Sequence, residues 1–406
     1  MPQRGGYAVP LLALTLGHVF ANAVRSIPAL AADVLQRDLI LSPEGLGLLT
    51  SIYPLAFALG MVPVGAALDR FGVRRTSLSL LAIAGSGAVL AALAPTAAAM
   101  VLAQALLGFG CAGMLMCPMT FAVRAVPPAR FMIWSGIILT FGNSGLLLSA
   151  SPLAFLVEAS GWRAGFWVSA GLALLAFLAV AATVPAERPV RAAGTSLLDD
   201  ARAVLALAAS RKLRPLMAIA FASFAVMFGI RGLWGGPWLM EAKGLSRIAA
   251  GNILLGFALA MTIAPVLCSA IGRALGRPVL LLAGSHFAVA LMLAAVVAGG
   301  PAGWGLPPAY DAAMFFLIGC VISFQILCFD QVRGLVPAEQ AGRALSAQNI
   351  SFFGGAAVLQ VVAGLAAAAG GPGGGPGGGP GAALLSFALA LVICTTLFLL
   401  LRPQAR

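Results

Sequence analysis

The sequence predicts an all-α membrane protein with twelve transmembrane helices in two pseudo-symmetric bundles of six. Hydrophobic residues make up 61% of the 406 residues and charged residues only 9%, with a mean hydropathy of +1.03, whereas soluble domains are about 25% charged. Apolar runs recur at close to the ~20 residues that cross ~30 Å of hydrocarbon. A long polar interval then divides the expected spans six and six.

The expected elements follow from these runs. The first six spans are 8–31, 45–68, 76–95, 97–123, 131–157 and 163–184. The second six are 213–239, 247–271, 278–299, 309–332, 344–369 and 382–401. They define an N-terminal bundle (1–184), a cytoplasmic linker (185–212) and a C-terminal bundle (213–406). Within the linker, 199–212 is either a short amphipathic helix on the membrane surface or a solvated loop. The glycine- and proline-rich run 370–381 is expected to be a flexible outer loop.

The basic residues predict the orientation of the chain. If the N-terminus is cytoplasmic, 18 of the 24 Lys and Arg residues fall in inner segments. The six that do not are Arg25, Arg37, Arg163, Arg231, Lys243 and Arg247. By the positive-inside rule both termini are therefore expected in the cytoplasm of a bacterial cell, with the chain in the inner membrane. The net charge of +12 then reflects topology and predicts no nucleic-acid partner.

The loop expected between the second and third spans carries the motif G-x-x-x-D-R-x-G-x-R-R. Its residues are Gly65, Asp69, Arg70, Gly72, Arg74 and Arg75. The first glycine would let two helices approach closely and the second would permit a tight reversal. The aspartate can accept hydrogen bonds from a helix N-terminus, and the arginines can meet helix C-termini or anionic lipid.

In this position the motif resembles the cytoplasmic signature of the major facilitator superfamily, and the resemblance covers essentially the whole chain. It implies two bundles that rock about a central site, with the motif latching them together on the cytoplasmic side. The corresponding loop of the second half, 272–277, keeps glycine and arginine but has no acidic residue. A second latch is therefore expected to be degenerate.

Two positions depart from the proton-coupled drug exporters of that superfamily. Gln104 stands where those proteins carry an arginine ahead of a glycine run in helix four. Helix five offers Gly-Asn-Ser-Gly at 142–145 in place of a Gly-Pro motif. The apolar cores also hold no obvious proton-carrying carboxylate. These departures weaken the antiporter interpretation.

Two arginines, Arg25 and Arg231, lie deep in apolar stretches about half the chain apart, with no acidic residue within a helical turn or two. A charge at membrane depth costs roughly 3 kcal/mol on insertion scales, so it usually serves a function. The planar guanidinium binds carboxylate, phosphate or sulfonate through two parallel hydrogen bonds. Organophosphate:phosphate exchangers resemble this chain in placing one arginine in helix one and one in helix seven. In the alternative interpretation the side chains snorkel outward or pair with Asp33 or Glu241.

The neighbours of the two arginines differ. His18 and Asn22 precede Arg25 by seven and three residues, so the three lie on one face of helix one. The same offsets before Arg231 give Phe224 and Phe228. The expected pocket is thus polar on one wall and aromatic on the other, which suits an amphipathic organic anion.

Other polar residues on apolar helices are more often partners in helix–helix hydrogen bonds than substrate contacts. They are Tyr53, Gln104, Asn143, Asn252, Gln325, Asn349 and Gln360. Of these, Tyr53, Asn143 and Gln325 join the candidate substrate site. For His18 a packing role competes with ligand contact or proton transfer, and His286 has the same alternatives. Trp234 and Trp238 are expected at the outer membrane interface.

The function expected is secondary active or facilitative transport of a small organic anion by rocker-switch alternating access. A proton-coupled drug or metabolite exporter is the alternative, and a non-transporting scaffold or sensor is a different class. Anion exchange or uniport fits the absence of an obvious proton-carrying carboxylate in the apolar cores. Proton symport would use His18, His286 or the charge of the substrate. We expect no enzyme activity, catalytic residue, cofactor or metal, because no nucleophile or metal-ligand cluster and no nucleotide-binding loop is visible. The expected partners are the substrate, a coupling proton or counter-anion, and the lipid bilayer around a monomer.

Overall fold

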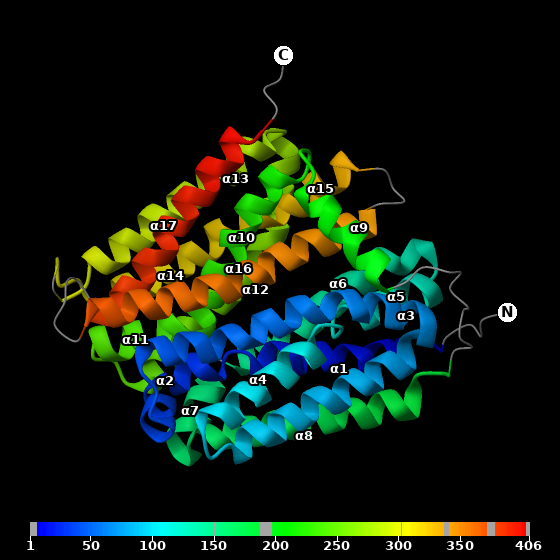
Figure 1. Cartoon of the computed structure of the whole chain (residues 1–406), viewed down its shortest axis with the longest axis horizontal. Coiled ribbons are helices and arrows are strands. Elements are labelled where there is room, and N and C mark those ends of the chain that lie inside the picture. Colours follow the sequence, from blue (N-terminus) through cyan, green and yellow to red (C-terminus); the bar gives the residue numbers. More distant parts are fainter. Residues whose placement is uncertain are drawn as a thin grey trace. The chain divides into compact units, whose positions relative to one another are not determined.

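The computed structural model describes residues 6–149, 151–186, 197–301, 303–336, 341–371 and 378–402. The regular elements of this part of the chain are all helices (Figure 1). It contains 11 helical segments long and apolar enough to cross a membrane, and Ala8–Val24 is a shorter apolar helix. The prediction of an all-α membrane protein with twelve helices is confirmed.

The first half of the sequence forms eight helices. They are α1 (Ala8–Val24), α2 (Ile27–Leu39), α3 (Pro43–Leu93), α4 (Ala97–Cys111), α5 (Met116–Ala125), α6 (Pro128–Leu148), α7 (Ser151–Ser160) and α8 (Trp162–Thr183). The long α3 carries two of the expected spans, interrupted at Gly72 with φ 78° and ψ 171°. This backbone conformation is essentially restricted to glycine, so Gly72 makes the reversal that the motif predicts.

The first expected span, 8–31, is wrong in its extent. Helix α1 ends at Val24 and α2 begins at Ile27. Pro28 has no N–H to bond the carbonyl of Val24, and its ring excludes that carbonyl from a regular helix. The break therefore falls at Arg25 and Ser26.

The second half continues with the remaining elements. They are α9 (Leu197–Ala209), α10 (Arg214–Gly229), η1 (Ile230–Trp234), α11 (Gly235–Pro237), η2 (Trp238–Ala242), α12 (Arg247–Leu275), α13 (Pro278–Ala298), α14 (Pro308–Ile322), η3 (Ser323–Ile326), α15 (Leu327–Leu335), α16 (Ala341–Gly370) and α17 (Gly378–Leu400). Helix α9 covers most of residues 199–212, the part of the linker expected to be either a short amphipathic helix or a solvated loop. Residues 372–377 of the predicted glycine- and proline-rich loop lie outside the described residues.

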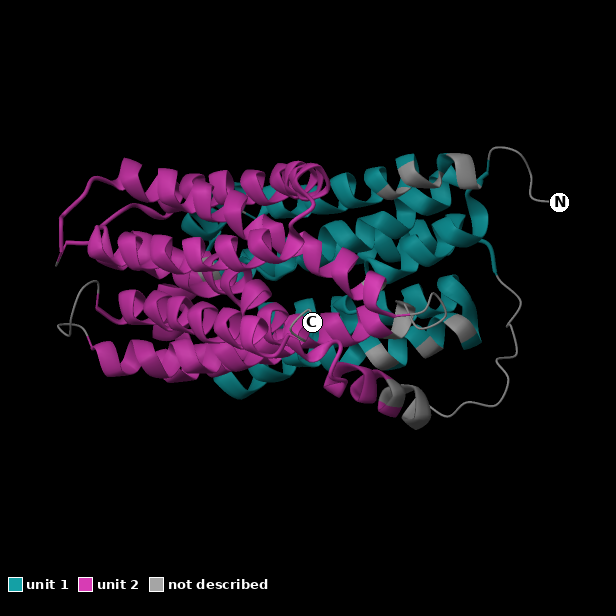
Figure 2. Cartoon of the chain, turned by 90° about the horizontal axis from the view of Figure 1, so that it is seen from above, with its two compact units in different colours: residues 1–27, 55–200 teal, residues 28–54, 201–406 magenta. Residues whose placement is uncertain are grey.

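The chain divides into two compact units, coloured separately in Figure 2. Unit 1 comprises residues 1–27 and 55–200, and unit 2 comprises residues 28–54 and 201–406. In unit 1, α1 packs against both α6 and α8. In unit 2, α10 packs against α16 and α17, which also pack against each other. The segment 28–54 belongs to the first half by sequence and to unit 2 by its contacts.

Candidate functional site

Arg231 is a buried charge in unit 2. Its relative exposure is 5%, and it belongs to a candidate membrane span that runs from Arg214 to Ala242. The surrounding turn, η1, is a π-helix. Pro237 leaves the carbonyl of Leu233 without its normal helical partner, and such local disruptions are accommodated by wider turns. Pi-helical turns are frequent at functional sites.

Two predicted site residues lie around the segment that carries Arg231. The ring of Phe228 stacks on that of Tyr53, with centroids 6.1 Å apart and an interplanar angle of 27°. Sδ of Met227 contacts the amide nitrogen of Gln325. Both contacts arise within about one helical turn before Arg231 and lie inside unit 2. Tyr53 and Gln325 are thereby brought to the same part of that unit.

One turn after Arg231, a further polar contact joins the same helix to α16. The indole Nε1 of Trp234 donates a hydrogen bond to Oε1 of Gln360 at 3.0 Å, and Gln360 is fully buried. Nε2 of Gln360 and Oε1 of Gln325 are buried without a hydrogen-bond partner among the described residues. Buried polar groups are normally satisfied, so these two atoms are open to water or a ligand. Gln360 is one of the polar residues noted on the apolar helices in the sequence, but it is not among the predicted site residues.

The aromatic wall expected at Phe224 and Phe228 is larger than predicted. The rings of these two residues lie 6.0 Å apart, and Phe224 lies 4.6 Å from Phe353 and 5.8 Å from Phe352. Phe352 in turn lies 5.6 Å from Phe329. The residues from α15 and α16 were missed because aromatic residues at helical spacing are indistinguishable from ordinary core in a sequence.

The predicted polar residues of helix one make a cluster with α6 in unit 1. Nδ2 of Asn22 donates to the carbonyl of Gly142 at 3.0 Å, and it lies 3.4 Å from Oδ1 of Asn143 and 3.3 Å from Nε2 of His18. A Cβ on Gly142 would stand 1.9 Å from the imidazole of His18. His18, Asn22 and Asn143 are therefore brought together, and their contacts include bonds between helices of the kind expected in packing.

Arg25 closes α1 as its C-cap, with φ −68° and ψ −13°. Its exposure is intermediate. Arg25 belongs to unit 1 and Arg231 to unit 2. Both take part in further polar, ring or electrostatic interactions.

His286 is fully buried on α13 and has both ring nitrogens engaged. Nδ1 lies 2.7 Å from the carbonyl of Leu282, and Nε2 lies 2.5 Å from Oγ of Ser223 on α10. If Nδ1 donates to the Leu282 carbonyl, Nε2 accepts the single hydroxyl proton of Ser223 in place of the carbonyl of Ile219, which lies 2.6 Å from the same hydroxyl. This arrangement satisfies the imidazole within the protein and links two helices of unit 2.

The tryptophans differ from the expectation of an interfacial position, since Trp234 and Trp238 are buried at 3% and 0% exposure. Nε1 of Trp238 donates to Oδ1 of Asp311 at 2.8 Å. The other oxygen of Asp311 lies 2.9 Å from Nζ of Lys243. The indole of Trp238 thus completes a buried ion pair rather than facing lipid.

The charged motif of α3 contacts the end of α8 through Arg74. Nη2 of Arg74 donates to the carbonyl of Ala181 near the end of α8 at 2.8 Å, as expected for an arginine that meets a helix C-terminus. Among the described residues, a Cβ on Gly65 would meet only Met116 Cε at 3.9 Å, so no close helix approach within this part of the structure requires this glycine. The side chain of Asp69 lies outside the described part of the structure.

An ion pair that sequence reasoning did not identify lies in unit 2 (Asp33 and Arg247). The guanidinium of Arg247 donates to both carboxylate oxygens, at 3.0 and 2.8 Å, and also contacts the carbonyl of Leu30. Partial burial favours the neutral acid, but the hydrogen bonds and charge of Arg247 outweigh it. The pKa of Asp33 is therefore lowered below its ordinary value. Asp33 and Arg247 are 214 residues apart in the sequence, which is why no local pattern indicates this pairing.

Apolar helices in this number, with buried charged and polar residues inside two compact units, define a multi-pass helical membrane protein. Residues 14–360 match the Major Facilitator Superfamily. The chain belongs to this superfamily.

Curated relatives match part of the chain. The Tetracenomycin C resistance and export protein of Streptomyces glaucescens is 31% identical over 210 residues, which is 49% of this chain and 35% of that protein. The Multidrug resistance protein B homolog of Mycobacterium tuberculosis is 32% identical over 144 residues, 34% of this chain and 25% of that protein. The Niacin transporter NiaP of Acinetobacter baylyi is 27% identical over 43% of this chain and 39% of that protein. The match thus spans well under half the length of each relative.

Solved structures match over nearly the whole chain. The nucleoside transporter NupG superposes with a TM-score of 0.77 at 15% identity, covering 98% of this chain and 99% of that chain. A D-xylose-proton symporter superposes with a TM-score of 0.78 at 14% identity, covering 98% of each chain. At these identities the likeness shows the shared fold.

Proposed function

We propose that this protein is a transporter of a small organic anion, a carboxylate, phosphate or sulfonate with an apolar body, working by alternating access. Arg231 is the residue that binds the anionic group in unit 2. The observation that carries the proposal is its burial at 5% exposure in an apolar span. Placing a guanidinium at membrane depth costs roughly 3 kcal/mol on insertion scales, which a purely structural helix avoids by using an apolar residue.

The surroundings of Arg231 support an amphipathic substrate. The amide groups of Gln325 and Gln360 and the ring of Tyr53 contact the segment around Arg231, and two buried amide atoms have no partner among the described residues. The phenylalanine cluster around Phe224 offers an apolar surface within two turns of the arginine. Ligand sites typically combine such an apolar wall with a few polar groups.

We further propose that Arg25, with His18, Asn22 and Asn143, is the contribution of unit 1. The hydrogen bonds of Asn22 hold α1 against α6 and fix the end of α1 that carries Arg25. Internal repeats in transporters of this type supply a binding residue from each half. The charge of Arg25 adds to anion binding whether the coupling is by exchange, uniport or proton symport.

Export of a drug or metabolite is the second candidate function. The relatives named for tetracenomycin C export and for multidrug resistance favour it. An aromatic wall is compatible with a large apolar substrate, and a charged drug could still bind Arg231. The two candidates differ in direction and in the need for an anionic group, so parallel uptake and efflux assays separate them.

The test is solute counterflow into proteoliposomes against panels of anions, cations and neutral solutes. We expect anions to compete, and Arg231→Gln to lower transport of the best anion about ten- to a hundred-fold, the value of a hydrogen-bonded charge pair. Arg231→Lys should fall between, because lysine keeps the charge but loses the planar fork. Arg25→Gln should also lower transport.

The control is Arg211→Gln, which removes an exposed arginine from the turn before α10. It should transport like the unaltered protein, and thermal unfolding of each variant verifies the fold. Competition by cations alone would refute the proposal. Full anion transport by both Arg25→Gln and Arg231→Gln would refute the role of the arginines.

A further inference from the structure

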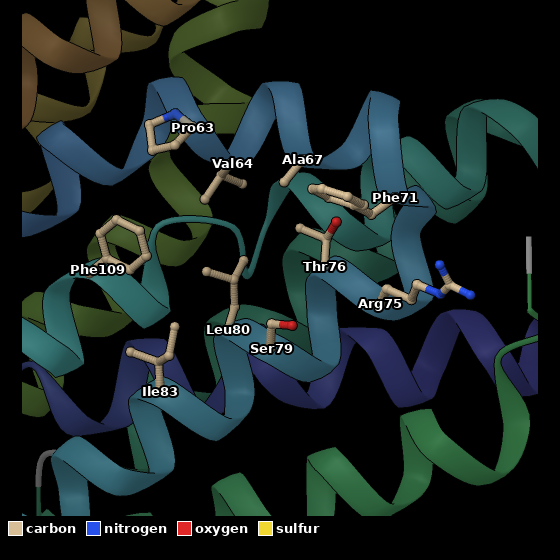
Figure 3. Close-up of a pocket in the computed structure, with 10 residues that line it drawn as sticks. All are labelled: Pro63, Val64, Ala67, Phe71, Arg75, Thr76, Ser79, Leu80, Ile83 and Phe109. Carbon is tan, nitrogen blue, oxygen red and sulfur yellow. The ribbon is translucent and has the colours of Figure 1, made fainter. Parts of the chain in front are cut away.

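Unit 1 contains a cavity of about 400 Å³ between the two limbs of α3 and Phe109 of α4 (Figure 3). Its lining is Pro63, Val64, Ala67, Phe71, Arg75, Thr76, Ser79, Leu80, Ile83 and Phe109. All of these residues belong to unit 1, and none is a candidate substrate residue. The volume lies in the ordinary range of ligand pockets, roughly 300–1,000 Å³.

The cavity has a charged end and an apolar end. Arg75 lies three residues beyond the helix break at Gly72, at the start of the candidate span Arg70–Leu93. Ile83 lies eight residues deeper, or about 12 Å along a helix. In Figure 3 the guanidinium of Arg75 extends away from the apolar side chains, which surround the rest of the space. The polarity therefore changes along the cavity as it does from a membrane surface into hydrocarbon.

Thr76 supplies an unused hydrogen-bonding group at the charged end. Its side chain is only 5% exposed, and its hydroxyl has no hydrogen-bond partner among the described residues. A helical threonine commonly donates to the carbonyl four residues earlier, as Thr262 does to Ala258 at 2.8 Å. For Thr76 that carbonyl belongs to Gly72, whose backbone is not helical. The hydroxyl instead points towards Phe71 across the space (Figure 3).

We propose that this cavity binds one anionic phospholipid of the surrounding bilayer. The lipid phosphate accepts hydrogen bonds from Arg75 and from the hydroxyl of Thr76. One acyl chain lies in the apolar part, against Phe109 and Ile83. A lipid matches the charged end of the cavity, the unused hydroxyl and the apolar end, because it joins an anionic group to an apolar chain. It is also already present where the helices meet the membrane.

The charges around the helix break favour an anionic headgroup over a neutral one. The short stretch from Arg70 to Arg75 contains three arginines. Arg74 is engaged with a helix carbonyl, whereas Arg75 is exposed. A basic residue near a membrane surface contributes about 1 kcal/mol to the attraction of anionic lipid.

The test follows thermal unfolding of the purified full chain in detergent during titration with dioleoyl phosphatidylglycerol. Dioleoyl phosphatidylcholine provides the same chains with a neutral headgroup, and inorganic phosphate provides an anion without chains. Phosphatidylglycerol should raise the melting temperature more than phosphatidylcholine, and phosphate should have no effect. Arg75→Gln should weaken the phosphatidylglycerol midpoint roughly five-fold, and Thr76→Val roughly ten-fold, the value of a hydrogen bond to a charged group.

Ala67→Phe fills the cavity and should abolish the response to both lipids. The matched controls are Arg211→Gln, an exposed arginine away from the cavity, and Thr262→Val, whose hydroxyl is bonded within its own helix. Both should respond like the unaltered protein. If Ala67→Phe does not fold, Arg75→Gln and Thr76→Val decide the outcome.

Three results would overturn the proposal. The first is an unchanged lipid response in folded Ala67→Phe, and the second is an unchanged phosphatidylglycerol midpoint in both Arg75→Gln and Thr76→Val. The third is an equal shift with inorganic phosphate alone, which would assign the site to a free anion.

Discussion

At the scale of single residues, buried polar groups distinguish this protein from an ordinary apolar bundle. Arg231 could be identified from the sequence because it is a charged residue in an apolar span, although Phe224 and Phe228 precede it on the same helix face. The structure adds Trp234 and Gln360, whose bond joins two helices far apart in sequence. That bond could not be predicted, because single-sequence patterns give the face of a helix but not which other helix covers it.

The ion pair between Asp33 and Arg247 predicts a pH dependence of stability. The pKa of Asp33 is lowered in the folded protein, so the pair stabilises the fold above the unfolded-state pKa, about 4. This contribution is lost as the pH falls through the folded-state pKa. We expect Asp33→Asn to lower the melting temperature at about pH 7, with a difference that shrinks towards about pH 3.

The control for this prediction is Arg37→Gln. Nη2 of Arg37 lies 3.7 Å from Oδ2 of Asp33, and the Arg37 side chain is 72% exposed. Removal of the Arg37 charge should therefore change the free energy of unfolding by less than about 1 kcal/mol. Melting curves of the purified variants in detergent across the pH range make the comparison. A constant difference for Asp33→Asn from neutral to acid pH would contradict the prediction.

At the scale of helices, backbone chemistry determines where the apolar runs break. The hydropathy pattern located most spans correctly but extended the first one past Val24. Proline explains that break and accounts for the wide turns near Arg231. The positive φ of Gly72 matches its place in the motif, whereas Gly65 meets no close neighbour. The conformational freedom of glycine thus predicted the break at Gly72. Whether two helices approach closely at Gly65 can be judged only from the tertiary structure.

The crossing of α10 and α16 gives a prediction about packing. A Cβ on Gly355 would stand 1.9 Å from the backbone carbonyl of Phe221, whereas one on Gly354 would meet none of the described residues within 4 Å. Small residues at such crossings let helix backbones approach closely. We expect Gly355→Ala to destabilise the protein by about 1–3 kcal/mol through overpacking.

Gly354→Ala is the matched control on the same helix. It should be neutral or stabilise by up to about 1 kcal/mol, because alanine favours the helix without a clash. Thermal unfolding of both variants measures the difference. Equal melting temperatures for the two variants would show that the crossing relaxes without loss of packing.

At the scale of the whole molecule, the fold follows from composition more directly than the site does. A high apolar content and runs of span length predict a helical bundle, because only helices and closed barrels satisfy the backbone inside lipid. The motif of α3 then predicted the superfamily that the match over residues 14–360 shows. Substrate recognition depends on a few side chains from helices distant in sequence, and composition carries no information about their assembly.

The charge distribution predicts that both ends of the chain face the cytoplasm, because 18 of the 24 Lys and Arg residues would then lie in inner segments. A fluorescent protein fused after residue 402 should fluoresce, and alkaline phosphatase fused there should be inactive. Phosphatase inserted at 303–305, between α13 and α14, should be active. The opposite pattern at both positions would reverse the assigned orientation.

The boundaries of the compact units fall at chemically distinctive positions. The chain leaves unit 1 at Pro28 and returns to it after Pro54. Neither proline can donate the helical hydrogen bond, to the carbonyls of Val24 and Thr50 respectively. Helices bend at the lowest cost at such positions. The chain therefore crosses between the units at two positions where a proline removes one backbone hydrogen bond of the helix.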